Sequence, residues 1–172
     1  MLGILLTMEF ASELRYFEAP PEQRAAVQEQ LRERLSAHAE IRMAYLLGSF
    51  LTARSFRDID IAVYFEPDFL HTVDPLRYCF QIADELERAV RYPVDVHLLN
   101  DAPCGFRFEA TRGVVLVSRD EPFRIDWTVR TWQEYCDFEP HQRRMLQEIL
   151  KPFAERYARY QEAHHADSVA ER

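Results

Sequence analysis

The stretch that decides the fold is Leu46-Leu47-Gly48-Ser49-Phe50-Leu51-Thr52-Ala53-Arg54-Ser55-Phe56-Arg57-Asp58-Ile59-Asp60-Ile61-Ala62-Val63. An apolar run ends at Gly48-Ser49, and eight residues further on Asp58-Ile59-Asp60 opens a second apolar run. The first run predicts a strand followed by a turn or short helix, where free backbone N–H groups and a hydroxyl can hold phosphate oxygens. In the second run, the strand period of two puts both carboxylates on one face and the isoleucines on the other.

A third carboxylate extends this pattern. Two acids about 7 Å apart along a strand can share hard divalent cations such as Mg²⁺. Asp95 lies inside another apolar run, Val94-Asp95-Val96-His97-Leu98-Leu99, where a lone carboxylate would be costly. Each acid alone has an ordinary explanation: a turn residue, an arginine partner, or a polar residue on an edge strand. Together with Gly48-Ser49, the three favour a site for metal-assisted chemistry on a nucleotide.

Composition narrows the class of protein. The chain has 172 residues, of which 48% are hydrophobic and 29% charged, as expected for one globular domain. Its net charge of −8, from 21 basic and 29 acidic residues, argues against a protein that binds nucleic acid by neutralising phosphates. The apolar start, residues 1–8, is too short to span a membrane and lacks the basic region of a signal peptide. Cys79, Cys104 and Cys136 show no metal-binding spacing, so we expect free thiols in a cytoplasmic protein without a membrane partner.

Periodicity and turn residues predict the order of elements. Strands are expected at residues 41–47, 59–65, 94–99 and 114–117, a loop at 66–74, and helices at about 20–39, 75–91, 106–112, 122–138 and 140–165. Phe80, Ala83, Leu86 and Val90 are expected near the apolar face of the second helix, and the turn at residues 100–103 offers a helix cap. The pattern predicts an α/β (α+β) fold, a small mixed sheet flanked by helices. We expect a single domain over residues 1–172, with its core at about 20–120 and C-terminal helices at about 121–165.

These residues resemble the signature of the DNA polymerase β nucleotidyltransferase superfamily. The resemblance rests on Leu47-Gly48-Ser49 and Asp58-Ile59-Asp60-Ile61, and on the segments 94–103, 113–116 and 135–140. It covers about residues 42–144 and is greatest to the small MNT-type (minimal nucleotidyltransferase) proteins, which pair with HEPN-domain toxins. The resemblance therefore implies a nucleotidyltransferase fold with a C-terminal helical extension.

The resemblance also implies a reaction and roles for individual residues. Asp58 and Asp60 would hold two Mg²⁺ ions, and Asp95 would complete the catalytic metal site. Gly48 and Ser49 would contact the phosphates of ATP. AMP would pass to a tyrosine hydroxyl of the HEPN toxin, which silences the toxin, so the chain would act as its antitoxin.

Two departures from the family pattern concern the loop between Ser49 and Asp58. It is about two residues shorter than usual and lacks glycine, and Arg57 stands where the family usually has serine before the first aspartate. Arg54 and Arg57 are candidate nucleotide-binding residues because guanidinium groups neutralise phosphates, although loop arginines equally often pair with nearby acids.

Three alternatives stay open at this point. A non-catalytic antitoxin with a degenerate site would cover its toxin and lack affinity for Mg·ATP. A small-molecule nucleotidyltransferase of the aminoglycoside type would usually carry a larger C-terminal domain. A structural domain would keep the three carboxylates too far apart to share a metal. The sequence leaves open the acceptor and whether the chain forms a homo-oligomer.

Overall fold

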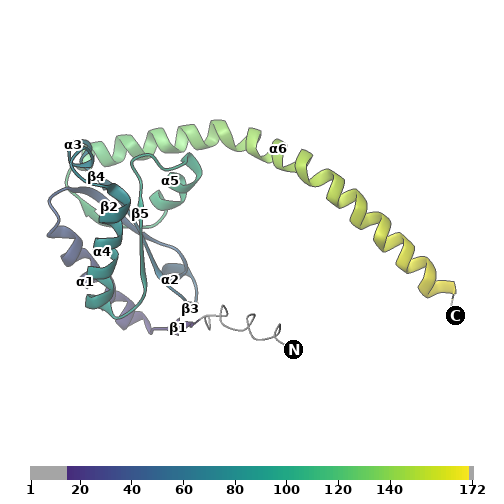
Figure 1. Cartoon of the computed structure of the whole chain (residues 1–172), viewed down its shortest axis with the longest axis horizontal. Helices are drawn as coiled ribbons and strands as arrows, with labels where there is room; N and C mark the ends of the chain where they lie inside the picture. Colours follow the sequence, from purple (N-terminus) through teal and green to yellow (C-terminus); the bar gives the residue numbers. More distant parts are fainter. Residues whose placement is uncertain (1–14, 171–172) are drawn as a thin grey trace, which may run out of the picture. The chain divides into compact units, whose positions relative to one another are not determined.

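The computed structural model describes residues 15–170, so the predictions for the apolar start lie outside the described residues (Figure 1). The described chain falls into two compact units, the first ending at Val129 and the second beginning at Arg130. In order, the elements are β1 (Phe17–Glu18), α1 (Pro21–Ser36), β2 (Ile41–Leu47), α2 (Ser49–Thr52), β3 (Ser55–Phe56), β4 (Ile59–Phe65), α3 (Pro67–Leu70), α4 (Pro75–Val90), β5 (Val94–Leu98), α5 (Cys104–Thr111), β6 (Val114–Ser118) and α6 (Glu121–Ala170).

The main sheet has the strand order β5-β4-β2-β6. Strands β4 and β5 run parallel, whereas β2 is antiparallel to both β4 and β6. Helices α1 and α4 contribute buried residues to the core on one face, and α5 and the start of α6 contribute to the core on the other. The predicted fold class, a small mixed sheet flanked by helices, is confirmed.

Strand β4 has two different faces, as its sequence predicts. Ile59, Ile61 and Val63 are fully buried in the core that includes α1 and α4. Ala62 and Tyr64 belong to the opposite core, where the Tyr64 ring lies 5.9 Å from the ring of Trp127. Asp60 shares the parity of Ala62 and Tyr64, so the strand period directs its side chain away from the isoleucines.

Helix α4 begins where the sequence predicts, but one residue of its apolar face was assigned wrongly. The Asp74 carboxylate accepts hydrogen bonds from the backbone N–H groups of Leu76 (3.1 Å) and Arg77 (3.3 Å), which caps the helix. Its buried face consists of Cys79, Ile82, Ala83, Leu86 and Val90. Phe80 is instead 72% exposed, because the contact face is centred on Cys79 and Ile82, and Phe80 falls outside it.

Three local predictions need correction. The segment 66–74 contains the short helix α3. Asn100 does not cap α5. Its side chain accepts from the N–H of Phe65 (3.0 Å) and donates to the Phe65 carbonyl (2.9 Å), so it continues the pairing at the end of β4. Helix α6 is continuous through Pro140 and Pro152, whereas a break was expected before Pro140. Proline removes one backbone donor, and the helix-forming residues around it carry the helix onward.

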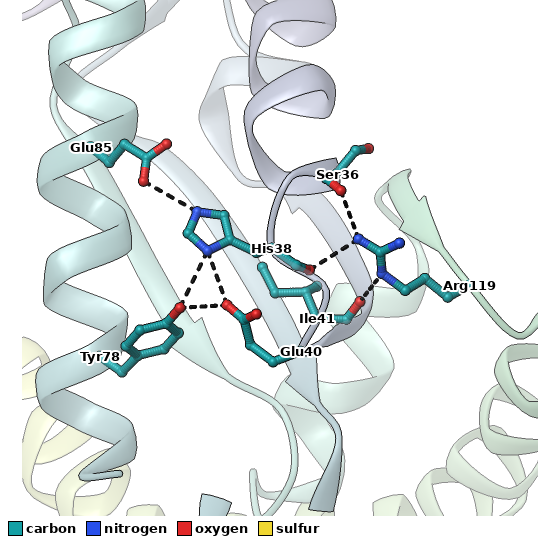
Figure 2. A network of polar contacts seen from close by, with 7 residues as sticks. All are labelled: Ser36, His38, Glu40, Ile41, Tyr78, Glu85 and Arg119. Atoms are coloured by element: carbon teal, nitrogen blue, oxygen red, sulfur yellow. Dashed lines mark hydrogen bonds and ion pairs between the residues drawn. The ribbon is translucent and has the colours of Figure 1, made fainter. Parts of the chain in front are cut away.

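A polar network ties the end of α1 to β2 and α4 (Figure 2). His38 lies between two carboxylates, with Nδ1 3.0 Å from Glu40 and Nε2 3.2 Å from Glu85, and Tyr78 donates to Glu40. On the other side, Arg119 donates to the carbonyls of Ser36 (2.7 Å), His38 (3.0 Å) and Ile41 (2.9 Å). This one side chain thereby joins the last carbonyl of α1 to the loop after it and to the first residue of β2.

Within the described residues, Cys79, Cys104 and Cys136 are free thiols, and burial raises the pKa of the Cys79 thiol to about 11. In this part of the chain no helix combines the length and the apolar character needed to cross a bilayer.

Candidate functional site

The backbone of Gly48 and the carboxylate of Asp60 are in close contact. Gly48 has φ +81° and ψ −163°, a conformation essentially restricted to glycine. A Cβ atom at this position would lie 2.0 Å from Oδ2 of Asp60. Leu47 pairs with Asp60 across β2 and β4, so the end of β2 brings the turn directly against this acid. The predicted phosphate-binding turn and one predicted metal ligand therefore lie together.

Asp95 lies beside Asp60 on the neighbouring strand. The two residues are partners in the parallel register of β4 and β5, and adjacent strands are about 4.8 Å apart. Val94 and Val96, which flank Asp95, pack into the core that includes α4. The strand period therefore directs Asp95 to the same face as Asp60, and two of the three predicted acids are neighbours.

Asp58 comes just before β4 and is held by its sequence neighbour. Nε of Arg57 lies 3.1 Å from Oδ2 of Asp58, and the Asp58 side chain is 19% exposed. Arg57 is thus placed on a predicted metal ligand, and its predicted contact with a phosphate remains a prediction.

His97 lies beside the acids and was not among the predicted site residues. Its Nε2 lies 3.5 Å from Oδ1 of Asp60, and its ring meets the ring of Phe106 edge-on at 5.3 Å. The hydrogen bond to Asp60 raises the pKa of His97 against the lowering effect of burial, and the charges of Asp60, Asp95 and Asp58 raise it further. The signal in the sequence is its spacing, because His97 follows Asp95 by two residues on a strand.

The donor set fits magnesium in its chemistry. Carboxylate oxygens are the ligands that Mg²⁺ prefers, and the Asp60 carboxylate fills the space beside Gly48 where another residue would carry its Cβ. Among residues 15–170, however, no group of three or more His, Cys, Asp or Glu side chains is already arranged to hold a metal ion. Arg57 contacts Asp58 and His97 contacts Asp60, so a bound Mg²⁺ would compete with these two side chains for the carboxylates.

Arg24 holds the short loop after Ser49, a role that no pattern in the sequence predicts. This α1 residue donates from Nη1 to the carbonyl of Phe50, from Nη2 to the carbonyl of Arg54 (2.7 Å), and from Nε to the carbonyl of Ala19 (3.0 Å). Its guanidinium also lies 5.4 Å from the ring centre of Phe50. One side chain thereby fastens both ends of the segment 50–54 to α1, across a sequence separation of 26 to 30 residues.

The remaining predicted residues border this loop. Ser49 is the first residue of α2, and its carbonyl accepts from the N–H of Ala53 at 2.9 Å. The Arg54 side chain is 89% exposed and lies 3.4 Å from Oε1 of Glu18. Phe56 is buried against Phe50 at a ring distance of 4.9 Å. Ser49 therefore begins α2 directly after the Gly48 turn, whereas Arg54 points toward β1.

Comparison with solved structures shows the same fold. A chain of the complex of tri-AMPylated Shewanella oneidensis HEPN toxin with MNT antitoxin matches with a TM-score of 0.58 and 19% identity, over 74% of this chain and 98% of that one. A chain of the MntA–HepT toxin–antitoxin matches with a TM-score of 0.58 and 18% identity, over 73% and 98%. A toxin–antitoxin with AMP-PNP also gives 0.58, with 20% identity over 72% and 98%. At these identities the likeness concerns the fold.

The family itself is shown by the sequence. No curated protein matches the chain. The family model for the polymerase beta nucleotidyltransferases matches residues 29–122, more than half of the chain. This span contains the turn at Gly48, all three acids and His97. The chain therefore belongs to the polymerase beta nucleotidyltransferase family.

Proposed function

We propose that the protein is a Mg²⁺-dependent nucleotidyltransferase that transfers AMP from ATP to a tyrosine hydroxyl of a HEPN toxin and so acts as its antitoxin in the cytoplasm. One observation carries the proposal: the Asp60 carboxylate lies against Gly48, with Asp95 in register beside it. The turn can bind phosphate oxygens and the carboxylates can bind Mg²⁺. The two therefore lie side by side in one site. The activity is assigned to one nucleotidyltransferase domain with a C-terminal helical extension.

Each residue has a role in this proposal. Asp58, Asp60 and Asp95 would hold two Mg²⁺ ions, which neutralise the triphosphate and lower the pKa of the attacking hydroxyl when bound. Gly48 and Ser49 position the β- and γ-phosphates. Asp95 orients the acceptor tyrosine and takes its proton. The tyrosine oxygen bonds to the α-phosphorus as the bond to pyrophosphate breaks, and pyrophosphate leaves.

The structural matches support the choice of acceptor and nucleotide. One of the matched complexes contains an AMPylated HEPN toxin together with an MNT antitoxin, and another contains AMP-PNP. These are properties of those proteins. The present chain shares their fold over nearly their whole length, which makes the same reaction the first to test.

The test is transfer of labelled AMP from ATP to a purified HEPN toxin. Asp60→Asn should lower the rate at least about 100-fold, since a ligand and its charge are lost where charge develops. Asp68→Asn changes an exposed acid of α3 and serves as the matched control, with an unchanged rate. AMP transfer by Asp60→Asn at the rate of the unaltered chain would contradict the proposal.

The non-catalytic antitoxin remains the second candidate because Arg57 lies on Asp58. If this pair replaces the metal, the protein binds its toxin without nucleotide chemistry. AMP transfer by the unaltered chain distinguishes the two candidates, because a binding-only protein transfers none. In the enzyme, Arg57→Ser separates the two roles open to Arg57: equal or faster transfer indicates release of Asp58, and slower transfer indicates that Arg57 binds the phosphates.

A further inference from the structure

A cleft of about 600 Å³ runs along the outer edge of β5. One wall comes from α4, with Leu76 and Phe80, and the other from the segment after β5, with Pro103 and Phe106. Figure 1 shows α4 and β5 side by side. Asp95 and His97 also line this cleft, so it is continuous with the candidate site.

The floor of the cleft is a strand edge with backbone groups to offer. Strand β5 ends the described sheet, with β4 on its other side. The Pro93 carbonyl accepts from Ile59 (2.9 Å) and the Leu99 N–H donates to Val63 (2.8 Å), so the odd positions face β4. Backbone groups alternate along a strand, and those of Val96 and Leu98 therefore point away from β4. An extended polypeptide can add to such an edge.

The wall from α4 is apolar and exposed. Phe80 is 72% exposed and Leu76 is 65% exposed, although the opposite face of α4 is buried in the core. The two side chains are four residues apart and so lie on one stripe of the helix. A large apolar side chain of a bound segment would contact this stripe.

The charge of the cleft is acidic. Asp84, Asp95 and Asp101 line it, together with Glu87, which accepts from the N–H of Val94 at 3.0 Å. Asp84 forms a loose ion pair, 3.9 Å from Arg88 on the same helix. No Lys or Arg occurs among the residues that form this cleft in the described chain. A segment with Lys or Arg beside its apolar residue complements this lining.

We propose that this cleft binds the acceptor: an extended, basic segment of the partner protein that pairs with the edge of β5, places an apolar side chain on Phe80 and Leu76, and brings its tyrosine hydroxyl to Asp95. The assignment rests on the proposed function and specifies its substrate. It explains why a phenylalanine on α4 is exposed next to an acidic strand edge.

The first measurement is binding without nucleotide, by fluorescence anisotropy. The probes are two labelled peptides with one tyrosine and one leucine each, flanked in one by Lys and Arg and in the other by Glu. The basic peptide should bind the full chain, and the acidic peptide should bind at least about tenfold more weakly, a difference of about 1.4 kcal/mol. Phe80→Ser and Asp101→Lys should each weaken the basic peptide about fivefold or more.

Matched controls separate this site from general stickiness. Phe153→Ser removes another exposed phenylalanine, on α6, and Asp68→Lys reverses an exposed acid of α3. Both should leave peptide binding unchanged. Affinity for Mg·ATP should be the same in Phe80→Ser as in the unaltered chain.

Several results would overturn the inference. These are absence of binding by the basic peptide, equal binding of both peptides, or binding that both cleft variants leave intact. A weakened affinity for Mg·ATP in Phe80→Ser would assign the cleft to the nucleotide instead. Failure of the proposed function looks different, because peptide binding then persists while AMP transfer is absent.

Discussion

Gly48 is the residue on which the candidate site depends most. Its φ of +81° is unfavourable for any side chain, and the Asp60 carboxylate occupies the space where a Cβ would stand. Gly48→Ala should lower the free energy of unfolding by about 1–3 kcal/mol. It should also displace the Asp60 carboxylate and so lower the affinity of the chain for Mg·ATP. Urea unfolding and calorimetry measure the two effects.

Gly105 provides the matched control for this substitution. A Cβ at Gly105 meets nothing within 4 Å, and the residue lies in α5, where alanine is favoured over glycine by about 0.5–1 kcal/mol. Gly105→Ala should therefore leave stability equal or higher and Mg·ATP binding unchanged. Equal losses in both variants would contradict the role given to Gly48.

The residues of the site were predictable to different degrees. Three acids and the turn at Gly48 could be predicted from the sequence. Asp58, Asp60 and Asp95 lie in or beside apolar runs, where a carboxylate without a partner would be costly. His97 carries a weaker signal, a shared strand face with Asp95. Arg24 carries none, since its three acceptors are backbone carbonyls and any residue has a carbonyl. The partner of Arg57 was likewise open until the structure placed it on Asp58.

The loop after α2 is held by α1 through Arg24. Arg24→Lys keeps the charge but loses the planar group that reaches three carbonyls. At about 1 kcal/mol for each hydrogen bond lost, stability should fall by about 1–3 kcal/mol. Hydrogen exchange at residues 49–54 should accelerate, and the KM for ATP should rise.

The control for Arg24 is Arg32 on the same helix. Its guanidinium pairs with Glu29 at the surface of α1, a contact worth about 0–0.5 kcal/mol. Arg32→Lys should change neither exchange in the loop nor the KM. Unchanged exchange at 49–54 in Arg24→Lys would show that the loop is held by something else.

The junction of α1, β2 and α4 should respond to pH through Glu40. Burial raises the pKa of Glu40, but the hydrogen bonds from Tyr78, from its own backbone and from His38 outweigh burial, and the net pKa lies below its ordinary value. Such a group stabilises the fold above its unfolded pKa of about 4.3, and this contribution is lost as pH falls through the lower folded pKa.

Glu40→Gln tests this dependence. The amide keeps an acceptor for Tyr78 but loses the charge that faces His38, so stability near pH 7 should fall by about 1–2 kcal/mol. Urea unfolding at several pH values should show the difference from the unaltered chain shrinking as the solution is acidified below about pH 4. A difference that does not depend on pH would rule out the charge as its cause.

Regular elements followed from the sequence where periodicity was strong. Strands β2 (Ile41–Leu47) and β4 (Ile59–Phe65) begin and end at the predicted residues. Each coincides with an apolar run of strand length. The two-residue strands β1 and β3 were missed, since their pairing comes from packing of Phe17 on Phe56. The break predicted before Pro140 was wrong, as proline discourages a helix locally without deciding its end.

The family model accounts for residues 29–122 of the first unit, and the chain adds its own features to this part. The matched structures are covered almost completely, whereas about a quarter of this chain lies outside the match. In the second unit of the chain, helix α6 exposes a series of large apolar side chains, among them Met145, Ile149, Phe153 and Tyr157. Hydrophobic periodicity predicted helix there but gave no account of what this surface contacts.

We propose that Asp60, Asp95 and the turn at Gly48 together form a site for Mg·ATP. Isothermal titration calorimetry of the full chain with ATP, in the presence and absence of Mg²⁺, tests it most directly. We expect binding that requires Mg²⁺ and is weakened at least about tenfold in Asp60→Asn, with Asp68→Asn unaffected. Absence of binding by the unaltered chain, or equal affinity in Asp60→Asn, would contradict it.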